Sequence, residues 1–396
     1  MTNRPDNQAD VVIVGARCAG AATALLLARA GIRVLVLERG RPGADTLSTH
    51  ALMRAGVLQL HRWGLLDEIR SAGVPPVKRT VFRYGDDETA VTIKPIPGVD
   101  ALYAPRRTLL DRVLIEAAQR AGAIVQFDTT VTGVERDNRG RVSGVRARRA
   151  NGDTYTVGAT LSVGADGLGS RFSRWVEAPL ERQGTGAGAV IYAYVGGLDD
   201  RGYEWFYNPG VTGGVIPTNG GVSCVFVGTS NARFRQSLHA DVPASFASLL
   251  PEVSPDLAAR IRDGIVHPGM RSYPGIAAYR RRPWGEGWAL VGDAGYHRDP
   301  LSTRGISDAF RDAELLARAI VGGLDGGELS RTLEDYRLVR NRLSGQLFST
   351  TEAIASYSWD LETIPALLRS LAAAQADELS YLSELDSPLL FAADRR

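Results

Sequence analysis

The feature that most constrains the fold of this chain is a glycine-containing turn near its start. Residues 11–14 form a short apolar run typical of a buried parallel strand, and residues 19–30 are rich in Ala and Leu and predict a helix. Residues 34–37 predict the next strand. Gly15 and Gly20 lie in the turn, where the lack of a side chain lets the backbone approach a pyrophosphate at the helix N-terminus. The sequence therefore predicts a βαβ unit of a Rossmann-like, dinucleotide-binding domain.

Two charged residues refine this prediction. Arg17 stands at the middle position of the turn, where glycine is usual, so it either widens the approach or itself meets a phosphate or the cofactor ring. Glu38 follows the second strand and is placed to accept hydrogen bonds from a ribose. A carboxylate at that position favours FAD or NAD over a cofactor with a 2′-phosphate.

Two later segments strengthen the case for a cofactor site. Residues 164–171 read GADGLGSR and follow an apolar run at 160–163, and residues 292–300 read GDAGYHRDP and follow another at 288–291. In this order, the three segments resemble the FAD-contacting fingerprints of the group A flavoprotein monooxygenases, which have the para-hydroxybenzoate hydroxylase-like fold. The resemblance covers roughly residues 10–325.

The resemblance implies a set of cofactor contacts. A helix beginning near Gly305 would direct its N-terminus at the flavin pyrimidine and stabilise the anionic reduced flavin. Arg107 opens a helix that faces the same site, and Arg106 is an alternative for its role. The expected FAD-binding residues are Gly15, Ala16, Arg17, Cys18, Ala19, Gly20, Glu38, Arg39, Arg107, Val131, Asp166, Gly167, Asp293, Pro300 and Gly305.

Three positions depart from the family pattern. Tyr296 stands where His is usual, Thr303 where Gly is usual and Ser307 where Asn is usual. His50, His297 and Tyr296 are the candidate catalytic residues, because each lies in a segment expected near the flavin and can relay a phenolic proton. Each is equally consistent with a packed or capping residue.

The remaining pattern predicts an α/β fold, α+β overall. A Rossmann-like FAD-binding domain would carry an inserted antiparallel β-sheet substrate domain and a C-terminal helical segment. Helical spacing occurs at 58–69, 109–121, 306–321 and from 330 onward, and a β-meander is expected from strands at 131–135 and 142–146. Strands of the substrate domain are expected at 190–195, 203–207, 214–217 and 222–227.

The expected domains are discontinuous. The FAD-binding domain takes residues 1–75, 100–180 and 276–325, the substrate domain takes 76–99 and 181–275, and the helices take 326–396. An aromatic set in the substrate domain forms either its substrate face or its core: Tyr192, Tyr194, Trp205, Phe206, Tyr207 and Phe226. Alternation alone does not separate these two possibilities.

The function implied by the resemblance is FAD-dependent monooxygenation of an aromatic or polycyclic small molecule, using NAD(P)H and O2 through a flavin C4a-hydroperoxide. No second glycine fingerprint follows a strand, and the glycine pairs at 322–323 and 326–327 indicate a linker. NAD(P)H is therefore expected as a transient reductant, or a flavin reductase partner supplies reduced flavin.

Three alternatives stay open. A flavin-dependent halogenase is favoured by the segment at 299–302 but lacks the Trp-x-Trp-x-Ile-Pro signature, because Thr212 and Gly214 stand at the tryptophan positions before Ile216 and Pro217. An ene-reductase of the geranylgeranyl reductase type shares the glycine turn. A flavin-binding protein without catalytic activity is the third.

Composition excludes several other classes. The 396 residues are 44% hydrophobic and carry a net charge of +2, with no basic stripe for nucleic acid, and no uninterrupted apolar run is long enough to span a membrane. Cys18 and Cys224 make no disulfide framework, and residues 1–9 lack a signal core, so a cytoplasmic location is expected. The position of Cys18 at a helix N-terminus acts to lower its thiol pKa, but a structural role is favoured for this residue. The five histidines show no metal-ligand spacing, and either a monomer or a homodimer is expected.

Overall fold

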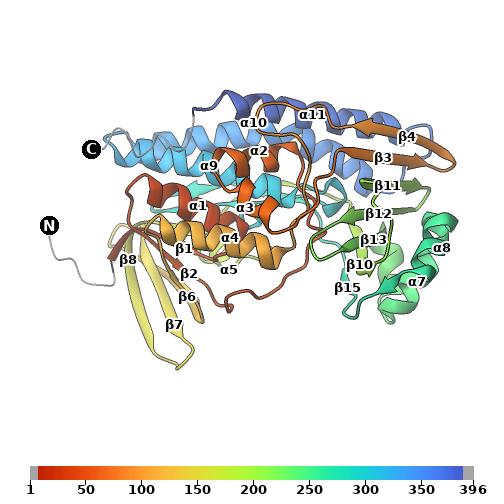
Figure 1. Ribbon diagram of the computed structural model, residues 1–396. Helices are drawn as coiled ribbons and strands as arrows, with labels where there is room; N and C mark the ends of the chain where they lie inside the picture. Colours follow the sequence, from red (N-terminus) through yellow and green to blue (C-terminus); the bar gives the residue numbers. More distant parts are fainter. Residues whose placement is uncertain (1–7, 387–396) are drawn as a thin grey trace.

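The structure, a computed structural model that describes residues 8–386, is organised around a sheet whose central strands are parallel (Figure 1). Five strands run parallel in the order β18-β8-β1-β2-β5. Strand β17 pairs antiparallel with β18, and β6, β7 and β8 form an antiparallel meander. The bounds are β1 Gln8–Val14, β2 Val34–Leu37, β5 Ile124–Gln126, β6 Thr129–Arg136, β7 Val142–Arg149, β8 Thr154–Gly164, β17 Trp284–Gly285 and β18 Trp288–Leu290. This order brings the carboxyl ends of β1, β8 and β18 to one edge.

Both faces of the parallel sheet are covered, because successive strand residues point to opposite sides. Val11 and Ile13 of β1 pack into a core with helices α1 (Cys18–Arg29), α4 (Arg107–Arg120) and α9 (Gly305–Leu324). Val12 and Val14 pack on the other side against the meander and helix α5 (Arg171–Trp175). A strand buried on both faces has the continuous apolar run that the sequence displays.

A second sheet is mainly antiparallel and has the order β14-β10-β13-β12-β11-β3-β4, with β15 also beside β10. Strand β3 pairs parallel with β11, so the β3–β4 hairpin, which comes from a segment between α3 (Leu66–Ser71) and α4, joins the edge of this sheet. The bounds are β3 Arg79–Tyr84, β4 Asp87–Thr92, β10 Gly188–Gly196, β11 Tyr203–Asn208, β12 Val211–Pro217, β13 Val222–Ser230, β14 Ile265–Val266 and β15 Arg271–Tyr273.

The two faces of the second sheet differ in chemistry. On β10, Ile191 and Val195 pack beneath helices α7 (Val242–Val253) and α8 (Pro255–Asp263). Tyr192 and Tyr194 of the same strand lie on the opposite face, in a cluster with other aromatic side chains. Alternation along one strand thus separates an aliphatic face from a tyrosine-rich face.

Two long C-terminal helices, α10 (Leu329–Ala355) and α11 (Ile364–Glu384), run along the upper side of the view in Figure 1. Leu333 and Leu343 of α10 belong to the core of the parallel sheet, whereas Leu347 and Ile354 belong to the tyrosine-rich core of the second sheet. One helix therefore contributes to both cores. A small third sheet has the order β19-β16-β9, from Tyr296–His297, Tyr279–Arg281 and Leu180–Gln183.

The remaining elements are short. They are α2 Arg54–Arg62, α3 Leu66–Ser71, α6 Asn231–Arg233, a π-helical turn at Phe234–Leu238 and 3-10 turns at Gly292–Ala294 and Pro300–Ser302. The predicted fold class is confirmed: mixed α/β sheets with C-terminal helices. The meander at β6–β8 and the strands β10 to β13 lie where the sequence predicts them.

Two local predictions are wrong. Residues 58–69 do not form one helix, because the chain turns at Gly64, whose φ is +69°, and α2 ends before it. The glycine pair at 322–323 is not a linker but lies inside α9. A Cβ at Gly323 would approach Leu329 Cδ1 to 2.7 Å, so this glycine permits close packing of α9 on α10. Gly326, with φ +96°, makes the actual turn.

Candidate functional site

The three fingerprint segments converge at the carboxyl edge of the parallel sheet. Gly15 has φ +107°, and a Cβ there would lie 2.6 Å from the carbonyl oxygen of Ala165. A Cβ at Gly20 would overlap the carbonyl of Gly15, and one at Gly292 would lie 2.8 Å from Ala19 Cβ. The first segment therefore touches both others through glycines, and the packing leaves no room for side chains at these three positions.

Glu38 and Arg39 follow β2 next to the turn. Glu38 Oε2 accepts a hydrogen bond from the backbone N–H of Ala16 at 2.8 Å, and Oε1 accepts one from Gly40 at 2.7 Å. The carboxylate thus lies against the glycine turn, where the ribose of a dinucleotide is expected. Arg39 is exposed, and the side chain of Val131 is buried in the core beside the meander, so a cofactor contact at Val131 would use its backbone.

Cys18 and Arg107 share one carboxylate. Cys18 Sγ donates to Asp111 Oδ1 at 3.1 Å, and Arg107 Nη2 donates to both oxygens of Asp111 at 2.9 and 3.0 Å. Burial, opposed by the Arg107 charge, raises the pKa of the Cys18 thiol well above its usual value. The expected lowering by the helix N-terminus is therefore wrong, and this thiol is a neutral, structural group.

Asp166 binds the first turn of the short helix α5, whose N-cap is Ser170. Its Oδ2 accepts from the backbone N–H groups of Arg171 and Phe172, at 2.8 and 3.0 Å, and its Oδ1 accepts from the Ser170 hydroxyl at 2.5 Å. Gly167 has φ +73°. The segment thus forms a capped turn beside the glycine turn, and a cofactor contact at Asp166 and Gly167 stays a prediction.

Asp293 and His297 form a line of polar groups with Tyr273. His297 Nδ1 lies 3.8 Å from Asp293 Oδ1, and His297 Nε2 lies 3.1 Å from the Tyr273 hydroxyl. The Tyr273 oxygen already accepts from the backbone N–H of Ile276 at 2.9 Å, so its own proton is free to be donated to His297. Burial, and then the charge of Asp299, raises the pKa of Tyr273. Tyr273 belongs to β15, so this line joins the two sheets.

Tyr296, the neighbour of His297, points elsewhere. Its side chain is buried with Ala278 and Phe348, and its hydroxyl lies 3.4 Å from the carbonyl of Ser344 on α10. Burial raises its pKa to about 12. Because adjacent residues on a strand face opposite ways, Tyr296 packs in the core while His297 does not, and its burial disfavours the predicted role as a base.

The turn before α9 carries Pro300, Thr303 and Gly305. Thr303 has φ +51°, a left-handed conformation that explains why the family usually has Gly there. Asp299 accepts from the backbone N–H of Gly188 on β10 at 2.6 Å, so the turn is tied to the second sheet. Burial, partly offset by its two backbone hydrogen bonds, raises the pKa of Asp299 to about 6.

A cluster of buried charged side chains connects the start of α9 to helix α11. Arg311 Nη1 donates to Glu378 Oε1 of α11 at 2.9 Å and to Asp308 Oδ1 at 3.0 Å, and Arg298 also pairs with Asp308. Although burial acts to raise it, Arg298 and Arg311 hold the pKa of Asp308 below its usual value. Arg304, the residue before α9, also contacts Glu378. The start of α9 is thereby fixed to the C-terminal helix.

His50 lies on the second-sheet side of the edge. Its backbone has φ +68°, its side chain is buried, and its Nε2 lies 2.5 Å from the Tyr194 hydroxyl. Burial, together with the charge of Arg107, lowers the pKa of His50 to about 3. The imidazole is therefore neutral and is a much weaker base than the sequence suggests.

Of the charged residues around His50, sequence reasoning named Arg106 but missed Asp45 and Arg271. Asp45 Oδ2 accepts from Arg271 Nη2 at 2.9 Å and from Arg106 Nη2 at 3.3 Å. Asp45, Arg271 and Tyr273 carry no local motif, because they come from a loop and from a three-residue strand. Nearly all basic residues of this chain are Arg, so the presence of an arginine at a given position did not indicate a binding site.

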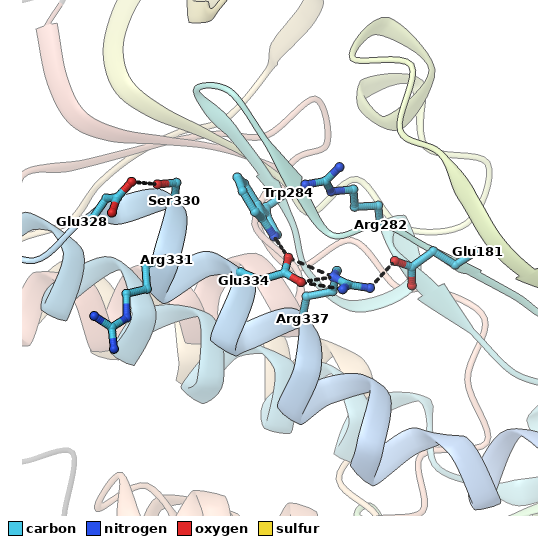
Figure 2. A pocket seen from close by; sticks show the side chains of 8 residues that line it. All are labelled: Glu181, Arg282, Trp284, Glu328, Ser330, Arg331, Glu334 and Arg337. Carbon is cyan, nitrogen blue, oxygen red and sulfur yellow. Dashed lines mark hydrogen bonds and ion pairs between the residues drawn. The ribbon is translucent and has the colours of Figure 1, made fainter.

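A surface pocket of about 550 Å³ lies elsewhere, between α10 and the segment before β18 (Figure 2). Its charged groups bind one another: Glu334 accepts from Trp284 Nε1 at 3.0 Å and from Arg337 Nε at 2.9 Å, and Arg337 also donates to Glu181 at 3.0 Å. The lining residues are Glu181, Arg282, Trp284, Glu328, Ser330, Arg331, Glu334 and Arg337. None of these belongs to the converging fingerprints, so the pocket has no part in the site described above.

Two further features are absent from the described part of the chain. Between residues 8 and 386, no helix has the length and apolar character needed to cross a membrane. Within the same range, no group of three or more His, Cys, Asp or Glu side chains is placed to hold a metal ion.

Comparison with known proteins identifies a family and several relatives of this chain. The sequence profile of the FAD binding domain family matches residues 8–351. Aklavinone 12-hydroxylase RdmE of Streptomyces purpurascens is 29% identical over 399 residues, covering 89% of this chain and 69% of that protein. The digeranylgeranylglycerophospholipid reductase of Methanothrix thermoacetophila is 26% identical over 326 residues, covering 81% of this chain and 79% of that protein.

A solved structure shows the same fold. The flavin-dependent brominase Bmp2 aligns with a TM-score of 0.79 and 19% identity, over 98% of each chain. At that identity the likeness concerns the fold alone. The names of the three relatives describe a hydroxylase, a reductase and a brominase, so the shared framework supports more than one reaction.

Proposed function

Because the chain belongs to the FAD binding domain family, as an FAD-dependent oxidoreductase related to monooxygenases, halogenases and geranylgeranyl reductases, we propose that it is a monooxygenase of aromatic or polycyclic molecules. The net reaction puts one atom of O2 into a C–H bond of the substrate and releases the other as water. NAD(P)H supplies two electrons and the solvent supplies one proton. A separate flavin reductase is the alternative source of electrons.

The residues around the glycine turns fit the cofactor. Gly15 and Gly20 allow a tight turn whose backbone can approach a pyrophosphate, and Glu38 lies where its carboxylate would accept hydrogen bonds from ribose hydroxyls. Arg107, Asp293 and the backbone near Gly305 would hold the ribityl chain and the ring. FAD, when bound, supplies the hydride acceptor and the site of O2 activation. The second sheet would be the substrate domain and the first the cofactor domain.

The observation that carries the proposal is the polar line from Asp293 through His297 to Tyr273. It lies at the junction of the two sheets and ends in a hydroxyl whose proton is free to move. A phenol that binds there can pass its proton to Tyr273 as Tyr273 donates its own to His297. Asp293 then stabilises the imidazolium. A deprotonated phenol is activated at its ring carbons, which is what hydroxylation requires.

The second sheet argues against a halogenase. Gly214 stands where that signature has Trp, and a Cβ there would already overlap the ring of Phe226. Thr212, at the other Trp position, is held by a hydrogen bond of 2.9 Å to the Tyr357 hydroxyl. Both positions are thus packed by other side chains. The tyrosines at 192 and 194, with His50 beside them, favour a polar aromatic substrate over a prenyl chain.

The test uses single-turnover measurements on the FAD-loaded protein. His297→Gln and Tyr273→Phe should slow oxygen transfer about 10²- to 10⁴-fold and increase hydrogen peroxide release, while FAD stays bound. Tyr296→Phe, which removes a hydroxyl from the neighbouring but buried side chain, is the matched control and should change neither rate. The measurement is anaerobic reduction by NAD(P)H with a panel of phenols, followed by mixing with O2.

Two outcomes would contradict the proposal. Product formed without O2, by saturation of a C=C bond, would identify a reductase. An unchanged pH profile and unchanged coupling in both His297→Gln and Tyr273→Phe would show that the phenolic proton leaves by another route.

A further inference from the structure

Arg271 of the second sheet and Arg106, the residue directly before α4, converge on one loop carboxylate. Arg271, the first residue of β15, donates to Asp45 Oδ2 at 2.9 Å, and Arg106 donates to the same oxygen at 3.3 Å. Arg106 is itself positioned from the second sheet, because its backbone N–H donates to Asn219 Oδ1 at 2.8 Å in the turn after β12. All three charged side chains retain some exposure, at 34%, 30% and 19% for Arg271, Arg106 and Asp45.

An aromatic platform lies directly beside this group. The guanidinium carbon of Arg106 lies 4.1 Å from the ring centroid of Tyr194, and Tyr192 packs edge-on to Tyr194 with centroids 5.9 Å apart. The Tyr194 hydroxyl contacts His50, and the Tyr192 hydroxyl accepts from the backbone N–H of Ser48 at 3.2 Å. A guanidinium over the Tyr194 ring, with the Tyr192 ring edge-on beside it, matches a planar ligand that carries an acidic group.

Several polar atoms in the same place have no partner. Arg106 Nε, Arg17 Nη1 and the Nδ1 of His50 are buried and meet no hydrogen-bonding group among the described residues. His50 is 1% exposed, so its ring is out of reach of bulk solvent. The group holds one carboxylate for three arginines, since Arg17 also reaches the Asp45 carbonyl at 3.5 Å. The two arginine nitrogens are donors, and buried donors without a partner indicate an acceptor that the described residues do not supply.

We propose that Arg106 and Arg271 bind a carboxylate of the substrate. In the absence of substrate, the carboxylate of Asp45 pairs with both arginines, and the substrate displaces it. The proposal rests on the monooxygenase function and narrows its substrate class to small aromatic acids. Arg17 ties the group to the glycine turn, so the bound acid would lie next to the cofactor. Asp45 lies in the irregular segment between β2 and α2, where a loop can yield its place to a ligand.

The test compares acid and amide forms of the same ring. Salicylate and salicylamide, and 2-naphthoate and 2-naphthamide, are titrated into the FAD-loaded protein, with tryptophan fluorescence and flavin absorbance as readouts. The wild-type protein should bind each acid more tightly than its amide. Arg271→Gln and Arg106→Gln should weaken acid binding about tenfold to hundredfold and leave the amides unchanged, since each loses a charge-assisted bond.

Two further variants make the result decisive. Asp45→Asn should tighten acid binding several-fold, because the internal competitor is removed, and an increase in affinity does not arise from misfolding. Arg233→Gln is the control: Arg233 is 38% exposed, follows β13 of the second sheet and pairs with Glu252 at 2.7 Å, so it matches Arg271 in setting. It should leave every dissociation constant unchanged.

Three results would overturn the assignment. The first is no preference for acids over amides. The second is loss of FAD from Arg106→Gln and Arg271→Gln at concentrations that saturate the wild-type protein, which would assign the arginines to the cofactor. The third is weaker binding of NAD(P)H by the two variants, seen as a higher NAD(P)H concentration needed for flavin reduction, with acid binding intact. That result would assign the arginines to the phosphates of NAD(P)H. Binding is measured without turnover, so failure of the monooxygenase proposal would appear separately, as unaltered acid binding without oxygen transfer.

Discussion

Around Gly15 and Gly20 the shape of the site is made by main chain, whereas around Asp45 it is made by side chains from four separate segments. In the first region a turn, a strand end and a helix start touch through glycines. In the second, a loop, a helix entrance and two strands each contribute one or two side chains. A main-chain site is most sensitive to added atoms, while a side-chain site is most sensitive to the loss of a charged or polar group.

The largest effect should come from adding one methyl group to the main-chain region. In Gly20→Ala the new Cβ would overlap the Gly15 carbonyl, so the turn must open. We expect a loss of about 2–4 kcal/mol in the free energy of unfolding and weaker FAD binding. Urea unfolding and FAD occupancy measure the two.

Gly345→Ala is its matched control. Gly345 lies in α10, and no neighbouring element has an atom within 4 Å of the place that an alanine Cβ would take. Alanine should therefore be neutral or stabilise the helix by up to about 1 kcal/mol. Equal losses in both variants would mean that the turn has no special intolerance, and the contrast between the two regions would fail.

The second prediction concerns the side-chain region around Asp45 and uses the pH dependence of the unfolding free energy. The pKa of His50 is about 3 in the folded protein, below its ordinary value of 6.5. The contribution of the neutral ring is complete above pH 6.5 and is lost as the pH falls toward 3, by up to about 1.4 kcal/mol per pH unit. His50→Asn removes the titration and keeps a residue type that adopts positive φ.

The readout is the difference in unfolding free energy between wild type and His50→Asn, measured at intervals from neutral pH down to about pH 4. It should shift in favour of the variant as the pH falls. Taking the difference cancels the opposite contribution of Asp299, whose raised pKa favours the folded protein on acidification. A difference that does not change with pH would show that His50 is not desolvated.

The smallest effect concerns an exception within the main-chain region. Thr303 carries a side chain although its φ is +51°, and its hydroxyl donates to the Ser302 carbonyl at 2.8 Å. Thr303→Gly relieves the left-handed strain but frees the unfolded chain, so the net change in stability should be less than about 1 kcal/mol. A calorimetric shift of many degrees in either direction would show that this turn is held more tightly than its neighbours.

The contrast also explains what could be predicted from sequence. Strands, helices and the glycine turn depend on residues that are close together in the chain. Hydrophobic periodicity therefore predicted the strands and helices, and Gly15 with Gly20 predicted the turn. Asp45 and Arg271 are 226 positions apart, and no spacing rule joins them. The break at Gly64 was missed because apolar residues continue across it. Tyr296 and His297 are adjacent in sequence, yet only the strand geometry assigns one to the core and the other to the junction.

Helix α10 has a mechanical consequence. Its first half is packed into one hydrophobic core and its second half into the other, and it is 27 residues long without a proline. A continuous helix of that kind bends gently but does not act as a hinge. Large rotations of one sheet relative to the other are therefore resisted, and small molecules are expected to enter and leave by displacement of loops such as the one that carries Asp45. Because α10 is part of both hydrophobic cores, the regions around the two sheets are also expected to unfold together in a single thermal transition.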